Sequence, residues 1–304
     1  MRKLRNFSIV LFILAAALFA FFRFREMSLQ DRSGPQIVMD ADLISVSIND
    51  PESKLLEGIT ATDAKDGDVT DTLIVENLST FLRPGTRLVR YAAFDNDMHV
   101  SRAEREIAYT DYRNPEFSIT EPLVFNAGNS NLLQNVTVSD CLDGDLSDTV
   151  KILSDSELLI DVPGDYNVRL KAANSAGDVA YLPVIITIRE GQSNNAPKIR
   201  LDNYVLYLNP GEEFDPYSLI SEISIGNTVY ELVEGEGNYG EEDLDPEEPV
   251  VVGTDQIRIS DMPDTSTPGN YTVTYSMTVP VGRYGEQVTG SANLYVVVRD
   301  IPVP

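Results

Sequence analysis

Apolar and polar residues alternate along most of the chain after residue 35. In 271–279 (YTVTYSMTV), tyrosine, valine and methionine alternate with threonine and serine, and 166–172 (YNVRLKA) repeats the pattern. A period of two predicts strands with one buried and one exposed face. The residues expected to face inward include Tyr166, Val168, Leu170, Tyr271, Val273 and Tyr275. Because Asp-Gly, Pro-Gly and Asn-rich turns separate these strands, we expect an all-β fold built of sandwich domains.

The first 26 residues follow a different pattern. An unbroken run of apolar or small residues extends from Phe7 to Phe22, with three basic residues before it and Arg23 and Arg25 after it. We expect residues 1–26 to form a signal anchor, which is one membrane-spanning helix, and a cleaved signal peptide is the alternative. The Ala-x-Ala at 15–17 lies inside the apolar run, which disfavours cleavage.

The orientation of this helix follows from size, because basic residues flank both of its ends. If the large C-terminal part is exported, the short N-terminal tail must stay in the cytoplasm. We therefore expect a single-pass protein of the cell membrane, with its body extracytoplasmic.

Part of the chain repeats itself. Segments 59–75 and 136–152 share seven identities in 17 positions. Four of these are the aspartate pairs Asp63/Asp140, Asp66/Asp143, Asp68/Asp145 and Asp71/Asp148. With a shift of two residues, Pro84-Gly85 aligns with Pro163-Gly164, and a third Pro-Gly, at 268–269, precedes another alternating strand. This recurrence predicts three β domains, at 36–111, 115–190 and 198–301.

The repeated motifs are "TATDAKDGDVTD" and "RPGTRLVRYAAFDND" in the first unit, and "TVSDCLDGDLSD" and "VPGDYNVRLKAANSAGD" in the second. They resemble a family of bacterial immunoglobulin-like (Ig-like) repeats. That family occurs in Gram-positive surface proteins and in accessory domains of some insecticidal crystal toxins. The resemblance covers most of 36–190. It implies tandem Ig-like sandwiches and a cell-surface setting, without enzyme activity.

The third domain departs from this pattern. It lacks the aspartate turn and contains an insertion, 231–249, with nine acidic residues and no basic one. Like charges without partners resist packing, so we expect this insertion to stay outside the fold. The join before the third domain, 191–197 (GQSNNAP), has the composition of an extended polar linker.

Charge excludes one class of partner. The chain has 23 basic and 48 acidic residues, a formal net charge of -25. Such a surface repels phosphate backbones, so we expect no nucleic-acid partner. Cys141 is the only cysteine, and no disulfide within the chain is possible.

The aspartate-rich turns have two interpretations. Clustered carboxylates can supply the oxygen ligands that calcium needs. The ligands would be Asp63, Asp66, Asp68 and Asp71 in the first domain, and Asp140, Asp143, Asp145 and Asp148 in the second. The spacing is not that of an EF-hand, however. Asp-Gly also suits a turn with positive φ, with the flanking aspartates bonded to nearby backbone N–H groups. We favour structural turns and expect no cofactor, with calcium as the alternative.

No catalytic constellation is evident. His99 is the only histidine and falls in a turn, and Cys141 has no basic neighbours to activate its thiol. We therefore expect a non-enzymatic, membrane-tethered surface protein whose domains serve as spacers, adhesion or protein-interaction modules. The alternative is an accessory module that binds carbohydrate or cell wall, with or without the help of calcium. Candidate aromatic platforms for a sugar are Tyr230, Tyr239 and Tyr284.

Overall fold

The computed structural model describes residues 2–29, 33–154, 157–191, 196–240, 249–281 and 286–300. Its first element is helix α1 (Arg2–Leu29). Within it, the 20 residues Asn6–Arg25 have a mean hydropathy of 2.4, and none of them is buried. At about 1.5 Å per residue this window measures about 30 Å, the thickness of a bilayer's hydrocarbon core. The expected N-terminal helix is therefore present, and it is long and apolar enough to cross a membrane.

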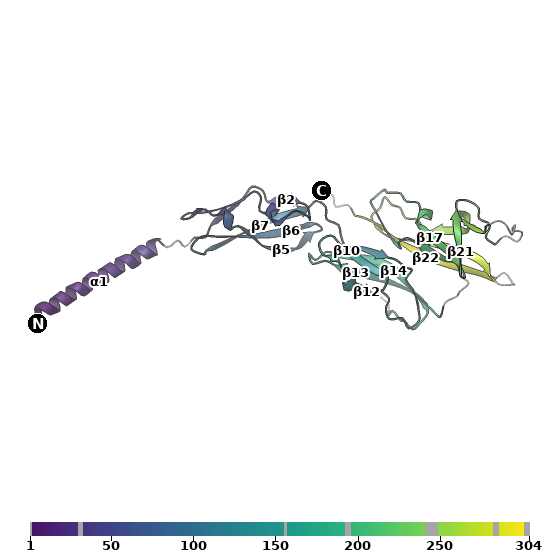
Figure 1. Cartoon of the computed structure of the whole chain (residues 1–304), viewed down its shortest axis with the longest axis horizontal. Coiled ribbons are helices and arrows are strands. Elements are labelled where there is room, and N and C mark those ends of the chain that lie inside the picture. The colour runs from purple at the N-terminus through teal and green to yellow at the C-terminus, as the bar shows by residue number, and fades with distance from the viewer. Residues whose placement is uncertain are drawn as a thin grey trace. The chain divides into compact units, whose positions relative to one another are not determined.

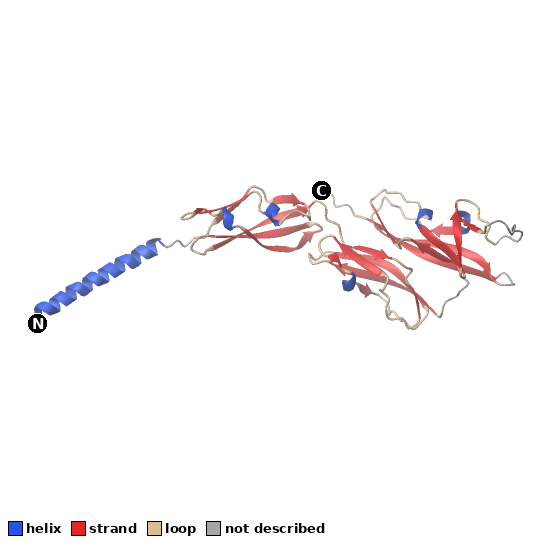
Figure 2. Ribbon diagram, viewed as in Figure 1, coloured by secondary structure: helices blue, strands red, loops and turns tan. Residues whose placement is uncertain are grey.

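Beyond α1 the chain is β-structure with only short helical turns (Figure 2). It divides into two compact units, Met1–Tyr112 and Arg113–Pro304. The first unit contains one pair of sheets, and the second contains two pairs (Figure 1). The all-β fold expected from the sequence is thus confirmed.

In the first unit, one sheet has the strand order β1 (Gln36–Met39), β3 (Ile59–Asp63) and β4 (Gly67–Asp68). The other has the order β2 (Leu43–Val46), β7 (Val100–Tyr109), β6 (Thr86–Phe94) and β5 (Ile74–Arg83). In the next pair, one sheet has the strand order β11 (Gly144–Asp145), β10 (Val136–Asp140) and β8 (Glu116–Ile119). The other has the order β12 (Lys151–Leu153), β13 (Gly164–Ala173), β14 (Val179–Arg189) and β9 (Val124–Asn126). Short helices accompany them: α2 (Glu52–Leu55), η1 (Thr70–Thr72) and η2 (Ser147–Thr149).

The last pair has four strands in each sheet. One sheet is β15 (Lys198–Leu201), β17 (Ile220–Ile225), β18 (Thr228–Val233) and β19 (Val251–Gly253). The other is β16 (Val205–Leu208), β22 (Glu286–Val298), β21 (Gly269–Val281) and β20 (Ile257–Ser260). The 3-10 turns η3 (Tyr217–Leu219) and η4 (Thr254–Gln256) lie between strands.

All three pairs of sheets share one topology. The opening strand pairs antiparallel within the first sheet, as β1 does with β3, β8 with β10 and β15 with β17. The chain then crosses to the other sheet, where the next strand runs parallel to the last one: β2 to β7, β9 to β14 and β16 to β22. The third pair therefore has the same architecture as the repeats, although it lacks their aspartate turn.

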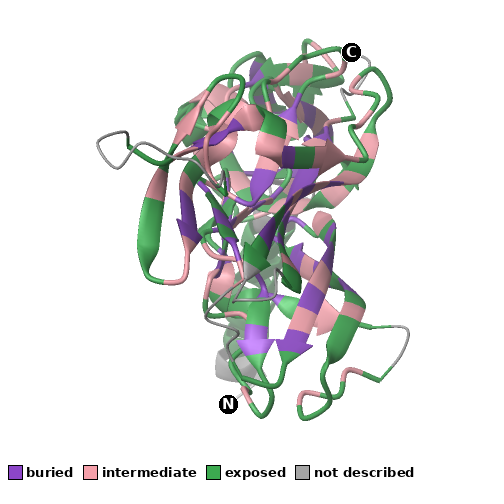
Figure 3. Ribbon diagram, turned by 90° about the vertical axis from the view of Figure 1, so that its right-hand side faces the viewer, coloured by how far each residue is buried: buried purple, intermediate pink, exposed green. Residues whose placement is uncertain are grey.

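In β3, β10, β13 and β14 the buried side follows the alternation in the sequence, and Figure 3 shows buried and exposed residues interleaved along the strands. Val168, Leu170, Val273 and Tyr275 are at most 4% exposed, as predicted. Two other residues expected to face inward, Tyr166 and Tyr271, are half-buried against the same core. In the second unit the buried apolar residues other than Ala176 form a single cluster that runs through both pairs of sheets, from Phe117 to Val298.

The acidic insertion differs from the expectation over part of its length. Residues 231–233 belong to β18, which pairs with β19, and Leu232 packs against the core. Tyr239 meets the Tyr230 ring edge-on, with 5.0 Å between centroids. Apolar side chains spaced among the acids thus anchor the start of the insertion, which net charge alone did not reveal. Residues 241–248 lie outside the described residues.

Candidate functional site

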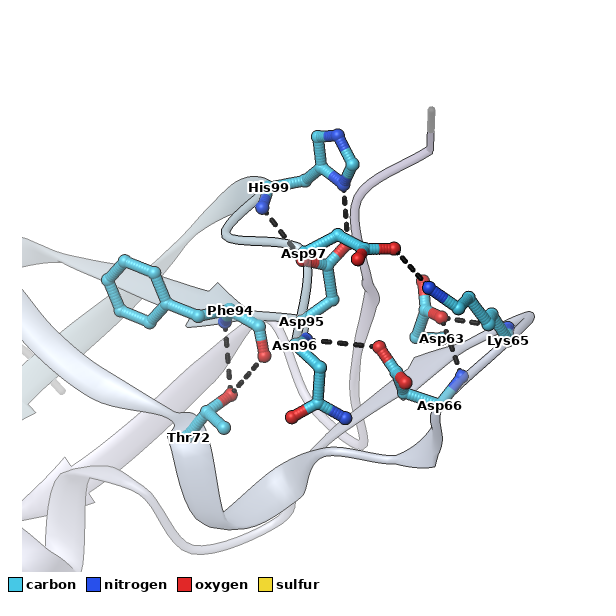
Figure 4. A network of polar contacts seen from close by, with 9 residues as sticks. All are labelled: Asp63, Lys65, Asp66, Thr72, Phe94, Asp95, Asn96, Asp97 and His99. Carbon is cyan, nitrogen blue, oxygen red and sulfur yellow. Dashed lines mark hydrogen bonds and ion pairs between the residues drawn. The ribbon is translucent and has the colours of Figure 1, made fainter. Parts of the chain in front are cut away.

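The aspartate turn of the first repeat is built by side-chain bonds to its own backbone (Figure 4). Asp63 Oδ1 accepts the backbone N–H of Lys65 at 2.8 Å and of Asp66 at 2.9 Å. Asp68 Oδ1 accepts that of Thr70 at 3.0 Å. Between them Gly67 has a φ of 78°, where a side chain would be strained. These carboxylates therefore shape the loop between β3 and β5.

The second repeat uses the same bonds. Asp140 Oδ1 accepts the N–H groups of Leu142 and Asp143, both at 2.9 Å. Asp145 Oδ1 accepts that of Ser147 at 2.9 Å, and Gly144 has a φ of 77°. The repeat alignment drawn from sequence thus extends to individual hydrogen bonds.

Electrostatics agree with a structural role. Hydrogen bonds from Thr70 lower the pKa of Asp68, and those from Ser147 lower the pKa of Asp145. A carboxylate whose pKa is lower in the folded state stabilises the fold above its unfolded pKa of about 3.9, and this stabilisation is lost as the pH falls through the folded-state value. Both turns should therefore loosen only in acid.

The remaining predicted ligands point to other partners. Asp66 Oδ2 accepts the backbone N–H of Asn96 at 3.0 Å, and Asp143 Oδ1 accepts the Ser175 hydroxyl at 2.7 Å. Asp71 and Asp148 are exposed, each on a 3-10 turn. Among the described residues, no three carboxylate, imidazole or thiol groups are placed to hold a metal ion together. Six of the eight aspartates thus accept hydrogen bonds from their own domain, and calcium binding stays the alternative to be tested.

A calcium titration tests the two interpretations. We expect calcium to change the free energy of unfolding by only a few tenths of a kcal/mol more than sodium at matched ionic strength. A true site would add about 2.7 kcal/mol at a hundredfold excess over the dissociation constant. The control is Asp66→Asn/Asp68→Asn, since an amide oxygen can still accept the same backbone N–H groups. A calcium-specific gain that this variant abolishes would make the turns metal sites.

One carboxylate oxygen in the first repeat has no partner. Asp63 is 7% exposed, and its Oδ2 accepts no hydrogen bond within the part of the chain that the structure describes. In the second repeat the equivalent oxygen, Asp140 Oδ2, accepts the side-chain amide of Asn174 at 3.1 Å. A buried polar atom without a partner destabilises a fold. The buried carboxylate oxygen is therefore hydrogen-bonded in the second repeat and lacks a partner among the described residues in the first.

The residue that occupies the place of Asn174 in the first repeat is Asp95. Asp95 Oδ1 accepts the backbone N–H of His99 at 2.7 Å, just as Asn174 Oδ1 accepts that of Asp178 at 2.9 Å. Asp95 is 5% exposed, and an ionised carboxylate has no hydrogen to donate. The first repeat thus places a second buried carboxylate where the second repeat has an amide donor.

Exchanging these residues should exchange the stabilities of the two turns. Asp95→Asn should raise the stability of the first unit by about 1 kcal/mol, because by the repeat alignment its amide takes the place of the Asn174 amide, which donates to Asp140 Oδ2. Asn174→Asp should lower that of the second unit by about 1–3 kcal/mol. Native-state hydrogen exchange at pH 7 reads each unit separately. Destabilisation by Asp95→Asn would show that the carboxylate's contact with His99 matters more.

The two residues considered for catalysis have structural partners. His99 Nδ1 lies 2.6 Å from Asp95 Oδ2, and the ring is half-buried in the turn before β7. The thiol of Cys141 donates to the backbone oxygen of Arg113 at 3.0 Å, and burial raises its pKa. A thiol with a raised pKa is a poor nucleophile at neutral pH.

The proposed aromatic platforms are not free rings on the surface. Tyr230 and Tyr239 are half-buried and contact each other, and burial raises the pKa of Tyr239. Tyr284 lies outside the described residues. A sugar site based on stacking against the rings of Tyr230 and Tyr239 therefore has little support.

The second unit holds a set of contacts that sequence reasoning missed. Tyr295 of β22 accepts the backbone N–H of Ile185 in β14 at 3.0 Å, and its hydroxyl donates to the oxygen of Ile185 at 3.3 Å. Tyr207 accepts the N–H of Phe117 at 2.6 Å. Arg299 pairs with Glu116 at 2.5 Å. Residues 192–195 of the expected linker are outside the described residues, but these contacts join the flanking sandwiches into one unit.

Beside these contacts lies a groove of about 530 Å³. It is lined by β9 and the end of β14 on one side and by β15, β17 and β22 on the other. We call the two bonds between the Tyr295 hydroxyl and the backbone of Ile185 the Tyr295 clamp. Binding sites commonly occur where two domains meet, and 530 Å³ is within their usual range of about 300–1,000 Å³.

Comparison with known proteins adds little to this picture. No protein-family model matches the chain, and no curated protein matches it. The CBM51-2 and INT domains of ZmpB from Clostridium perfringens, solved in complex with GlcNAc, are 17% identical over 49% of this chain and 27% of theirs, with a TM-score of 0.21. The extracellular domain of protocadherin GammaB4 is 15% identical over 89% of this chain and 50% of its own, with a TM-score of 0.18.

Human CDH23 EC21-23 is 17% identical over 87% of this chain and all of its own, with a TM-score of 0.21. The chain thus spans half or less of the ZmpB and protocadherin GammaB4 structures. Overlap at these TM-scores identifies neither a shared family nor a shared activity.

Proposed function

We propose that this chain is a non-enzymatic surface protein, held in the cell membrane by α1, whose Ig-like sandwiches bind a partner outside the cytoplasm. The observation that carries the proposal is the apolar window Asn6–Arg25, which is unburied throughout. Twelve large apolar side chains of α1 are at least 50% exposed. A surface of this kind is stable in lipid rather than in water.

The body suits a tethered binding module. Its sandwiches belong, on this proposal, to the Ig-like repeats of bacterial surface proteins that the aspartate and Pro-Gly motifs resemble. The strongly acidic surface keeps such a body soluble. The proposal of a non-catalytic role is supported by the partners of His99 and Cys141, which leave neither poised for chemistry.

Fractionation and surface proteolysis test the tether. We expect the full-length chain in the membrane fraction, with its intact N-terminus detected by mass spectrometry. Protease added outside intact cells should remove the body and leave a fragment of about the length of α1. A mature protein that begins near residue 21 and is found in the medium would contradict the anchor.

A second candidate function, carbohydrate or cell-wall binding, is favoured by the polar groove of the second unit. A pull-down of cell-surface material with the purified body, beside a glycan array, separates a protein partner from a glycan. The array is informative whether or not α1 is retained.

A further inference from the structure

The groove of the second unit has a charge that contrasts with the rest of the chain. Three basic residues line it, Arg189, Lys198 and Arg200, with two acidic ones, Glu121 and Glu222. The formal net charge of the whole chain is -25. Basic side chains are therefore concentrated here against the general trend.

Both acidic residues, Glu121 and Glu222, lie beside the same basic residue, Arg200. Glu121 forms an ion pair with Arg200, and Glu222 lies directly opposite Arg200 in the pairing of β15 with β17. Neither Arg189 nor Lys198 forms an ion pair within the described residues, and both are exposed. The lining thus has a formal net charge of +1, and its two bases outside any ion pair among the described residues are Arg189 and Lys198.

Uncharged polar groups complete its lining. Asn126, Gln134 and Asn135 line the groove, and so does Ser224, which is 9% exposed. Amides and hydroxyls donate and accept, so they suit a ligand with many hydroxyl groups. The one aromatic residue of the lining, Phe125, is 4% exposed and offers no ring for stacking.

The walls of the groove are held rigidly. The hydroxyl of Tyr295 bonds β22 to β14, and one apolar core continues through both sandwiches. At the rim, Gly290 leaves no room for a side chain, because a Cβ there would lie 1.7 Å from the backbone oxygen of Pro197. A preorganised groove binds without first having to order its walls.

We propose that this groove binds an acidic oligosaccharide, with its carboxylates at Arg189 and Lys198 and its hydroxyls on the amides. A sugar acid has one charge per residue, so it meets the two cations without the repulsion that a densely charged polyanion meets on this surface. A neutral sugar would leave both cations unused. The inference rests on the proposed binding role and specifies its ligand class and site.

The test uses the full chain in lipid nanodiscs, titrated with trigalacturonate by calorimetry. We expect saturable binding that weakens with added salt, and neutral galactotriose should bind at least tenfold more weakly. Arg189→Gln and Lys198→Gln should each weaken trigalacturonate binding about tenfold, the loss of one charge-assisted hydrogen bond. Lys151→Gln, an exposed lysine of β12 outside the groove, is the matched control and should change nothing.

Three outcomes would overturn the proposal. Trigalacturonate and galactotriose could bind equally, or inorganic phosphate alone could compete at equal concentration, or Lys151→Gln could weaken binding as much as the groove variants. If trigalacturonate does not bind while the chain still captures a partner from the cell surface, the groove assignment fails and the proposed function stands. If neither occurs, both fail.

Discussion

Arg105→Ala should lower the stability of the first unit by about 3 kcal/mol. Arg105 is 1% exposed, and its guanidinium donates to the backbone oxygens of Leu55 at 2.6 Å and Glu57 at 3.1 Å. It also donates to the hydroxyl of Tyr91 at 3.2 Å and lies over the ring of that residue. Alanine would leave a cavity and remove three hydrogen bonds at once.

The ion pair with Asp40 does not explain the burial of this charge. Asp40 lies 3.7 Å from Arg105 but is 68% exposed on its side chain, so water screens the pair. The backbone oxygens are the main partners, and one guanidinium nitrogen, Nε, has none among the described residues. Arg105→Lys should therefore recover little, because an ammonium cannot reach the separate oxygens as a planar fork does.

Arg90→Ala is the matched control. Arg90 is on the neighbouring strand β6 and pairs with Glu104 at 2.6 Å, but its side chain is 48% exposed. An exposed ion pair contributes about 0–1 kcal/mol, so the loss should be small. Urea unfolding of the full chain in detergent, read by hydrogen exchange in β6 and β7, gives both values. Equal losses for Arg90→Ala and Arg105→Ala would mean that the guanidinium of Arg105 is solvated.

The alternation of residues in β7 predicts that Arg105 faces the core, although its charge favours an exposed position. Ala103, Arg105 and Ile107 share one phase of the alternation in β7, and Ile107 is fully buried. Under the repeat alignment Arg105 falls at Val184, and Tyr91 at Leu170. The two repeats therefore fill the same core positions with a polar pair and with an aliphatic pair. Alternation predicts which face a residue occupies, but it does not say how a charge there is satisfied.

The aspartate turns could be predicted from the sequence, but the contacts between the two sandwiches of the second unit could not. The bonds of Asp63 and Asp140 to the following backbone N–H groups are local, and the spacing of the aspartates was enough to foresee them. The clamp at Tyr295 joins residues 110 positions apart, and the composition of the intervening linker holds no information about it. Long-range contacts depend on how two finished sandwiches meet. The groove lies between the same two sandwiches, so its presence could not be predicted from the sequence either.

Tyr295→Ala should separate the unfolding of the two sandwiches in the second unit. Tyr295 is 4% exposed and belongs to the shared core, so its truncation should cost about 3–5 kcal/mol. The bonds of its hydroxyl to Ile185 are the direct polar link between β22 and β14. We expect one cooperative transition for the second unit of the unaltered chain and two in the variant, by calorimetry and by hydrogen exchange in β14 and β22.

Two further substitutions divide this effect into its parts. Tyr295→Phe keeps the ring and deletes the hydroxyl, so it should cost about 1–3 kcal/mol through the unsatisfied backbone of Ile185. Tyr181→Ala removes a tyrosine of β14 that is 45% exposed, and its loss should stay within about 1 kcal/mol. A single transition that persists in Tyr295→Ala would show that the continuous apolar core couples the sandwiches without the clamp. The rigid groove would then depend on packing across the join rather than on this hydroxyl.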